Sequence, residues 1–187
     1  MILKYRVTLS GIKGFFRVYA VDANCTLYSF HKQMRADMEF PSDQPILFKA
    51  LDAAGAVVAR YALIDLGAGT VDRVSLKETV KAGVSSFVYF YDVTSRRSVI
   101  LTFEGEADEE AAGPTVIDTK GPNPIEFENG YVAYEDLPEE QKHRHRIKAE
   151  GDADAEEEED DDEDDTDESE EEEDEKEELL YDSDENQ

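Results

Sequence analysis

Tryptophan is absent from this chain, and cysteine occurs only once, at Cys25. A single cysteine excludes a disulfide bond within the chain. No apolar run approaches the roughly 20 residues that a helix needs to cross a bilayer, and residues 1–5 lack the apolar segment of a secretory signal. These absences argue against disulfide-stapled, secreted and membrane-spanning proteins, and they predict a soluble, cytoplasmic protein.

Basic residues are almost missing from the last 38 residues, 150–187, which hold 26 of the 47 acidic residues and one base, Lys176. Residues 1–149 carry 21 acids and 18 bases, a net charge of −3, so −25 of the total −28 lies in the C-terminal segment. A run such as 156–165 repels itself and has no apolar surface to offset the entropy of ordering it. The sequence therefore predicts a disordered acidic tail attached to one nearly neutral domain of ordinary size.

The N-terminal part of the chain alternates between apolar and polar residues and then changes to a helical period. Residues 3–9 and 16–20 predict two strands that pair across a turn at 10–14. After Thr26, a candidate N-cap, apolar residues follow at steps of three, four and four: Leu27, Phe30, Met34 and Met38. This spacing predicts a helix that ends before Pro41 and packs on a sheet.

Two more hairpins and a second helix are expected further along the chain. Ser75 and Glu78 have the spacing of a capping box, and Gly83 is placed to end the short helix that they begin. The remaining β-prone runs are 46–50, 57–63, 87–92 and 99–104. The resulting element order predicts an α+β fold, a mostly antiparallel sheet with two packed helices in a roll-like arrangement.

The composition changes after the last predicted strand. Residues 104–123 are acidic and then rich in glycine and proline, which indicates a linker or a loosely held extension. Apolar residues between 125 and 134 are able to return the chain to the domain, and 136–149 predict a polar helical stem. We therefore expect an α+β domain at 1–106, an extension with a stem at 107–149, and the disordered tail at 150–187.

Several of these segments together resemble one known family. They are the opening strand at 5–13, Thr26-Leu27 with Phe30-His31, Leu47-Phe48, and Phe90-Tyr91-Asp92. In this combination they resemble the plasmid pRiA4b ORF-three-like family over residues 3–106, with a weaker similarity at 129–131. The resemblance implies a compact α+β roll-like domain, and the family has no established biochemical activity.

The chain departs from that family at its polar positions. Members follow the Tyr-Asp pair with Phe-Gly-Asp, a tryptophan and a histidine, whereas Asp92 is followed by Val-Thr-Ser-Arg-Arg. Glu39-Phe40 stands where the family has Gly-Trp. Of the polar residues that could form a site, His31 and Asp92 remain. A general base or metal ligand at His31 near Asp92 is one interpretation, and a partly buried structural histidine is the favoured one.

Other catalytic and metal motifs are incomplete. Cys25 precedes the first helix, where a helix N-terminus could lower its pKa, but a small buried cysteine is the favoured interpretation. Residues 67–70 lack the third glycine and the Lys-Ser/Thr of a phosphate loop. His143 and His145 lie two residues apart, on different helix faces, and the tail lacks the ligand spacing of a calcium loop. We therefore predict no catalytic residue, no metal site and no cofactor.

Two segments suggest macromolecular partners. Arg96 and Arg97, with Tyr89 and Tyr91 on the aromatic strand 87–91, form a candidate nucleic-acid surface, although core packing is favoured for the aromatic rings. The basic cluster 142–148 stands next to the acids and is expected to act as their local charge partner. Leu179, Leu180 and Tyr181 are the apolar island of the tail and a candidate docking motif for a partner.

The favoured hypothesis is a non-enzymatic interaction protein whose polyanionic tail engages a basic partner or masks the protein's own surface. The alternative is a nucleic-acid-binding protein that its acidic tail inhibits. An enzyme built on His31 and Asp92 is the third hypothesis. The sequence predicts no membrane partner.

Overall fold

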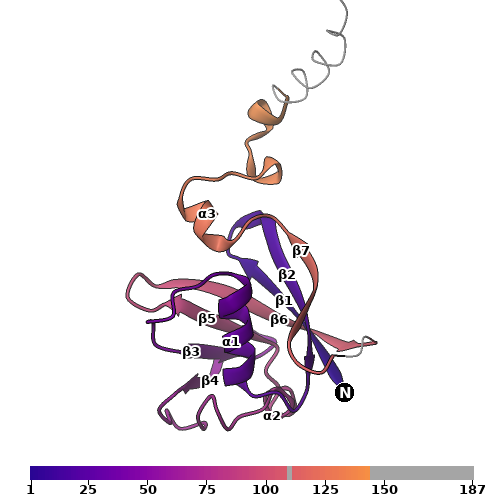
Figure 1. Cartoon of the computed structure of the whole chain (residues 1–187), viewed down its shortest axis with the longest axis vertical. Coiled ribbons are helices and arrows are strands. Elements are labelled where there is room, and N and C mark those ends of the chain that lie inside the picture. Colours follow the sequence, from indigo (N-terminus) through magenta and orange to yellow (C-terminus); the bar gives the residue numbers. More distant parts are fainter. Residues whose placement is uncertain (109–110, 144–187) are drawn as a thin grey trace, which may run out of the picture. The chain divides into compact units, whose positions relative to one another are not determined.

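A computed structural model describes residues 1–108 and 111–143 of the 187-residue chain. Its centre is a seven-stranded sheet in the order β4-β3-β5-β6-β1-β2-β7, in which every neighbouring pair is antiparallel (Figure 1). The strands are β1 (Ile2–Leu9), β2 (Ile12–Asp22), β3 (Leu47–Leu51), β4 (Val57–Ala62), β5 (Ser86–Asp92), β6 (Arg97–Ala107) and β7 (Thr115–Lys120). The helices are α1 (Leu27–Asp37), α2 (Leu76–Lys81), α3 (Pro124–Glu128) and the 3-10 turn η1 (Tyr134–Asp136). The predicted α+β class is confirmed.

The three predicted hairpins are present, because each pairs two runs of alternating residues through a short turn. β1 pairs with β2, β3 with β4, and β5 with β6. β5 is the clearest case, since its residues alternate between buried and half-buried along its whole length. The buried face of the sheet carries most of the core.

Helix α1 covers this face of the sheet (Figure 1). The hydroxyl of Thr26 accepts the amide of Ser29 at 3.2 Å, so the predicted N-cap is confirmed. The four apolar residues at helical spacing, from Leu27 to Met38, are all fully buried. The ring of Phe30 lies 5.6 Å from that of Tyr5 and 5.3 Å, edge to face, from that of Tyr19.

Helix α2 is short, and a sequence signal marks each of its ends. Ser75 and Glu78 form the predicted capping box, in which each side chain satisfies the other residue's backbone amide. Gly83 follows the helix with φ of +81°, a conformation that glycine adopts without steric cost. The helix packs through Leu76 and Thr79, which are both buried.

Residues 104–123, predicted to be a linker or a loosely held extension, contribute to two strands of the sheet. Glu104–Ala107 is the end of β6, and β7 adds a seventh strand by pairing with β2. The β-branched pattern of Thr115–Lys120 is a strand signal, but the acidic and glycine-rich residues before it obscured that signal.

The segment after β7 returns to the domain, as its apolar residues predicted. The ring of Phe127 lies 6.0 Å from Phe15 in an edge-to-face contact. The carboxylate of Asp136 accepts the amides of Lys13 and Gly14 at 2.7 and 2.9 Å, which fastens η1 to the start of β2. The tail and the stem beyond residue 143 lie outside the described residues. Among the described residues, no helix combines the length and apolar composition needed to cross a membrane.

Candidate functional site

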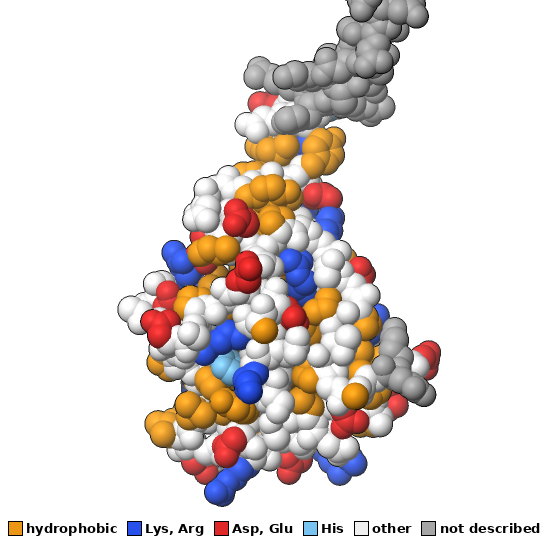
Figure 2. Space-filling view, in the orientation of Figure 1, with side chains coloured by type: hydrophobic (Ala, Val, Ile, Leu, Met, Phe, Trp, Pro, Cys, Tyr) orange, Lys and Arg blue, Asp and Glu red, His pale blue; other side chains and the backbone are white. Residues whose placement is uncertain are grey.

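An open groove of about 710 Å³ lies beside α1, and we call it the α1 groove. Figure 2 shows Lys and Arg side chains gathered next to a histidine on this face, beside a band of hydrophobic side chains. Its lining residues come from α1, from the segment before β3 and from the loops that follow β4: Tyr28, His31, Lys32, Arg35, Ala36, Phe40, Ser42, Gln44, Ile46, Leu63 and Asp72.

His31 forms the floor of the groove and is only 2% exposed. Its Nδ1 lies 2.8 Å from the hydroxyl of Tyr89. Burial, with a smaller effect of the positive charge of Arg35, lowers the pKa of His31 to about 4, so the imidazole is neutral at pH 7. Burial also raises the pKa of Tyr89 to about 12, which keeps the phenol protonated.

The neutral imidazole carries one proton, on Nδ1 or on Nε2. The hydrogen bond to Tyr89 is compatible with both tautomers, because a phenol hydroxyl is able to donate and to accept. Nε2 forms no hydrogen bond with any described residue, so it is a donor in one tautomer and an acceptor in the other.

Arg35 builds one wall of the groove. Its two terminal nitrogens donate to the backbone carbonyls of Ser42 and Gln44, each at 2.8 Å, and this fixes the segment before β3 against α1. Within the described part of the chain, Arg35 Nε and the side-chain carbonyl of Gln44 are buried without a partner. Unpaired polar atoms are costly in a protein interior, so their presence beside a groove is informative.

The charge of the groove is mixed but biased to positive. Lys32 is exposed on α1 and forms no ion pair with the described residues. Asp72 also lines the groove. Lys32 and Arg35 against Asp72 leave one net positive charge.

A second cavity, of about 320 Å³, continues the α1 groove, and we call it the apolar pocket. The two cavities share Ile46 and Leu63. Leu63 is 58% exposed and its neighbour Ile64 is 70% exposed, so two large apolar side chains stand in solvent at the junction. The remaining lining residues are Pro45, Leu47, Ala62 and Val93, none of which is charged.

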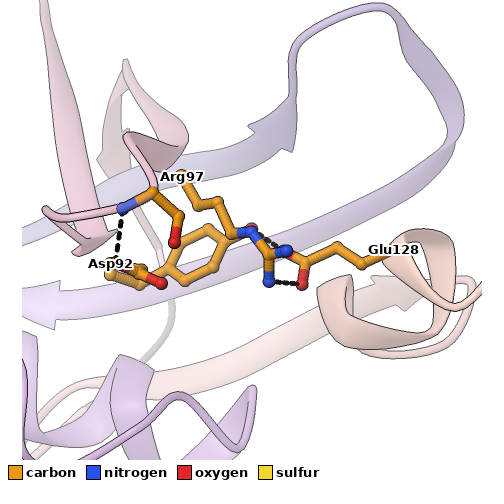
Figure 3. Close-up of polar contacts among 5 residues, drawn as sticks. Asp92, Arg97 and Glu128 are labelled. Carbon is orange, nitrogen blue, oxygen red and sulfur yellow. Dashed lines mark hydrogen bonds and ion pairs between the residues drawn. The ribbon is translucent and has the colours of Figure 1, made fainter. Parts of the chain in front are cut away.

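The candidate nucleic-acid residues do not form one exposed surface. Tyr89 is fully buried and Tyr91 is 6% exposed, which contradicts a base-stacking role for either ring. Arg97 is paired with one carboxylate oxygen of Glu128, and the other oxygen accepts the Tyr91 hydroxyl at 2.6 Å (Figure 3). Arg96 is exposed at the hairpin turn with φ of +57°.

His31 and Asp92 are not brought together. Asp92 ends β5 and accepts the amide of Ser95 at 2.9 Å, which closes the β5–β6 turn (Figure 3). His31 forms its hydrogen bond with Tyr89, and Asp92 is not among the residues that line the α1 groove. The two residues that an enzymatic mechanism would need therefore share no hydrogen bond in the described part of the chain.

Cys25 is partly exposed, and burial, with the nearby charge of Asp22, raises the pKa of its thiol. This is the opposite of the lowered pKa that a reactive cysteine requires. Among the described residues, no group of three His, Cys, Asp or Glu side chains is arranged to hold a metal ion. His145 and the tail motif Leu179, Leu180 and Tyr181 lie outside the described residues.

The α1 groove was not predicted, although part of its signal is in the sequence. Tyr28, Lys32 and Arg35 are spaced four and three residues apart, which places them side by side on one helix face. Their meeting with Ile46 and Leu63 depends on the tertiary fold and has no local signal.

Comparisons with known proteins identify a similar fold and no function. No protein-family model matches the chain, and no curated protein matches it. A crystal structure of a protein of unknown function from Methanosarcina mazei Go1 is similar, with a TM-score of 0.53 and 16% sequence identity. The similarity covers 66% of this chain and 72% of the other one. At this identity it shows a shared fold alone.

Proposed function

We propose that this chain is a divergent protein of the plasmid pRiA4b ORF-three-like type that acts as a non-enzymatic interaction protein. The observation that carries the proposal is the charge partition: residues 150–187 hold 26 acids and one base, while residues 1–149 are nearly neutral. Such a segment attracts a basic protein over a long range and accelerates its association. The island Leu179-Leu180-Tyr181 gives this segment an apolar anchor for its partner.

The state of the candidate catalytic groups supports a binding role over catalysis. The pKa of His31 is about 4, and Tyr89 holds its Nδ1. A general base for neutral pH needs a pKa near 7 and a partner in reach, and Asp92 shares no hydrogen bond with His31 in the described part of the chain.

An autoinhibited nucleic-acid-binding protein is the second candidate, and the exposed cation of Arg96 is the observation that favours it. In this version the acidic segment masks a basic surface of the protein. Burial of Tyr89 and Tyr91 and the pairing of Arg97 with Glu128 reduce that surface, so we place it second.

Calorimetry separates the two candidates. The full-length chain is compared with a variant of equal length in which the acids of 152–178 are replaced by Gln and Asn, and each is titrated with decalysine and with a 20-nucleotide oligo-dT. The interaction proposal predicts decalysine binding that weakens with salt and is lost in the neutralised variant. Oligo-dT binding that appears only after neutralisation would instead support the masked nucleic-acid surface.

A further inference from the structure

We propose that the α1 groove and the apolar pocket together bind an acidic peptide segment of a partner protein, one that carries a bulky apolar side chain beside its acids. This surface has the opposite polarity to the acidic segment of the chain, so it adds a second class of partner to the proposed function.

The α1 groove supplies the groups that a carboxylate needs. Lys32 presents an ammonium without an ion pair among the described residues, and Nε2 of His31 adds a donor on the floor when the imidazole carries its proton there. Arg35 adds its positive charge from the wall while its terminal nitrogens hold the backbone of Ser42 and Gln44. The carboxylate of Asp72 also lines the groove. It repels a ligand with closely spaced negative charges more strongly than it repels a single carboxylate.

The apolar pocket supplies a place for the side chain that accompanies the acid. Its volume of about 320 Å³ lies at the lower end of the range for ligand pockets, a size suited to one Leu or Phe side chain. Covering Leu63 and Ile64, which are now 58% and 70% exposed, removes apolar surface from water.

The neighbouring strand favours an extended peptide as the occupant. β4 is an edge strand, because it pairs only with β3 among the described strands. At Ala62 its outer side is already occupied, because the Ala62 carbonyl accepts the amide of Val71 at 3.0 Å. The part of β4 before Ala62 is the edge that a bound peptide could extend, and peptides often bind by adding a strand in this way. Nucleic acid fits less well, since the apolar half of the site would be unused.

Fluorescence anisotropy with synthetic peptides tests the proposal on the full-length chain. The host carries Leu179→Ser, Leu180→Ser and Tyr181→Ser, so that no other segment offers the same chemistry. The probes are the labelled peptides EELLFEED, EESSSEED without apolar residues, and QQLLFQQN without acids. We expect the first peptide to bind at least fivefold more tightly than either control, with an affinity that falls as salt rises.

Matched substitutions locate the site. Lys32→Gln should weaken EELLFEED at least fivefold, whereas Lys77→Gln, on the exposed face of α2, should leave binding unchanged. Leu63→Ser should also weaken it at least fivefold, whereas Leu66→Ser, at a side chain that is 47% exposed outside both cavities, should not. All four side chains are exposed, so circular dichroism should show an intact fold in each variant.

Four results would overturn the proposal. The first is no binding of EELLFEED at 1 mM peptide. The second is equal binding of the serine control, which would reduce the site to unspecific charge attraction. The third is equal affinity of the Lys32 and Lys77 variants for EELLFEED. The fourth is tighter binding of oligo-uridine than of the peptide, which would assign the surface to nucleic acid.

Discussion

Lowering the pH from 7 to 4 should destabilise the protein through His31, and the structure sets the size of the effect. The pKa of His31 is about 4 in the folded protein because of its burial and the charge of Arg35, against an ordinary value of 6.5. Above pH 6.5 the imidazole is neutral in both states, and its contribution to stability is complete. Between pH 6.5 and 4 the unfolded chain binds a proton at this histidine and the folded protein does not, so the free energy of unfolding falls.

The magnitude follows from the gap between the two pKa values. At about 1.36 kcal/mol per pH unit, the gap between 6.5 and about 4 corresponds to a loss of roughly 3 kcal/mol at pH 4. Below pH 4 the folded protein also takes up the proton, and the loss levels off. Few side chains are as enclosed as this one, which is 2% exposed, so solvent screening reduces the figure little.

Urea unfolding followed by circular dichroism measures this effect when the wild type is compared with His31→Gln at each pH. Glutamine has no proton to gain, and its side-chain carbonyl is able to accept the hydrogen of Tyr89. The many carboxylates of the chain titrate in both proteins and cancel in the difference. The wild type should lose about 3 kcal/mol more than the variant between pH 7 and 4. A difference that stays constant over this range, or an NMR titration of His31 with its midpoint near 6.5, would refute the reasoning.

Three further predictions concern packing and backbone geometry. Phe30→Ala should cost about 3–5 kcal/mol in urea unfolding, because its fully buried ring contacts two others, and a cost below 1 kcal/mol would place the ring outside the core. Gly121→Ala should destabilise strongly, since a Cβ there would meet a backbone oxygen at 2.1 Å and φ is +73°, whereas Gly113→Ala meets nothing within 4 Å and should be neutral in thermal melts. Glu128→Ala should cost about 1–3 kcal/mol by leaving the buried Tyr91 hydroxyl unpaired. In a double-mutant cycle, the same substitution should cost much less in the Tyr91→Phe background, where no hydroxyl is left unpaired.

The local parts of the fold were predictable because their signals are local. Alternation identified the three hairpins, and the Thr26 cap and the Ser75–Glu78 capping box marked the starts of both helices. The strand β7 was missed, since its pairing with β2 lies about 100 residues apart in sequence and its flanks have a linker's composition.

The candidate site was less predictable because it depends on long-range register. The contact of His31 with Tyr89 joins residues 58 positions apart, and it arises only once α1 lies on β5. Alternation showed that one face of β5 must be buried, and it left open which face that was. The pairing of Arg97 with Glu128 likewise depends on the return of α3 to the domain, for which the sequence carries only a few apolar residues.

A decalysine titration of the ¹⁵N-labelled full-length protein, followed residue by residue by NMR, tests the central claim most directly. The interaction proposal predicts that the amide shifts of residues 150–187 move with the peptide and return at high salt, while those of α1 and the β5–β6 turn stay in place. Shifts confined to residues 1–143, or no shift at low salt, would contradict it.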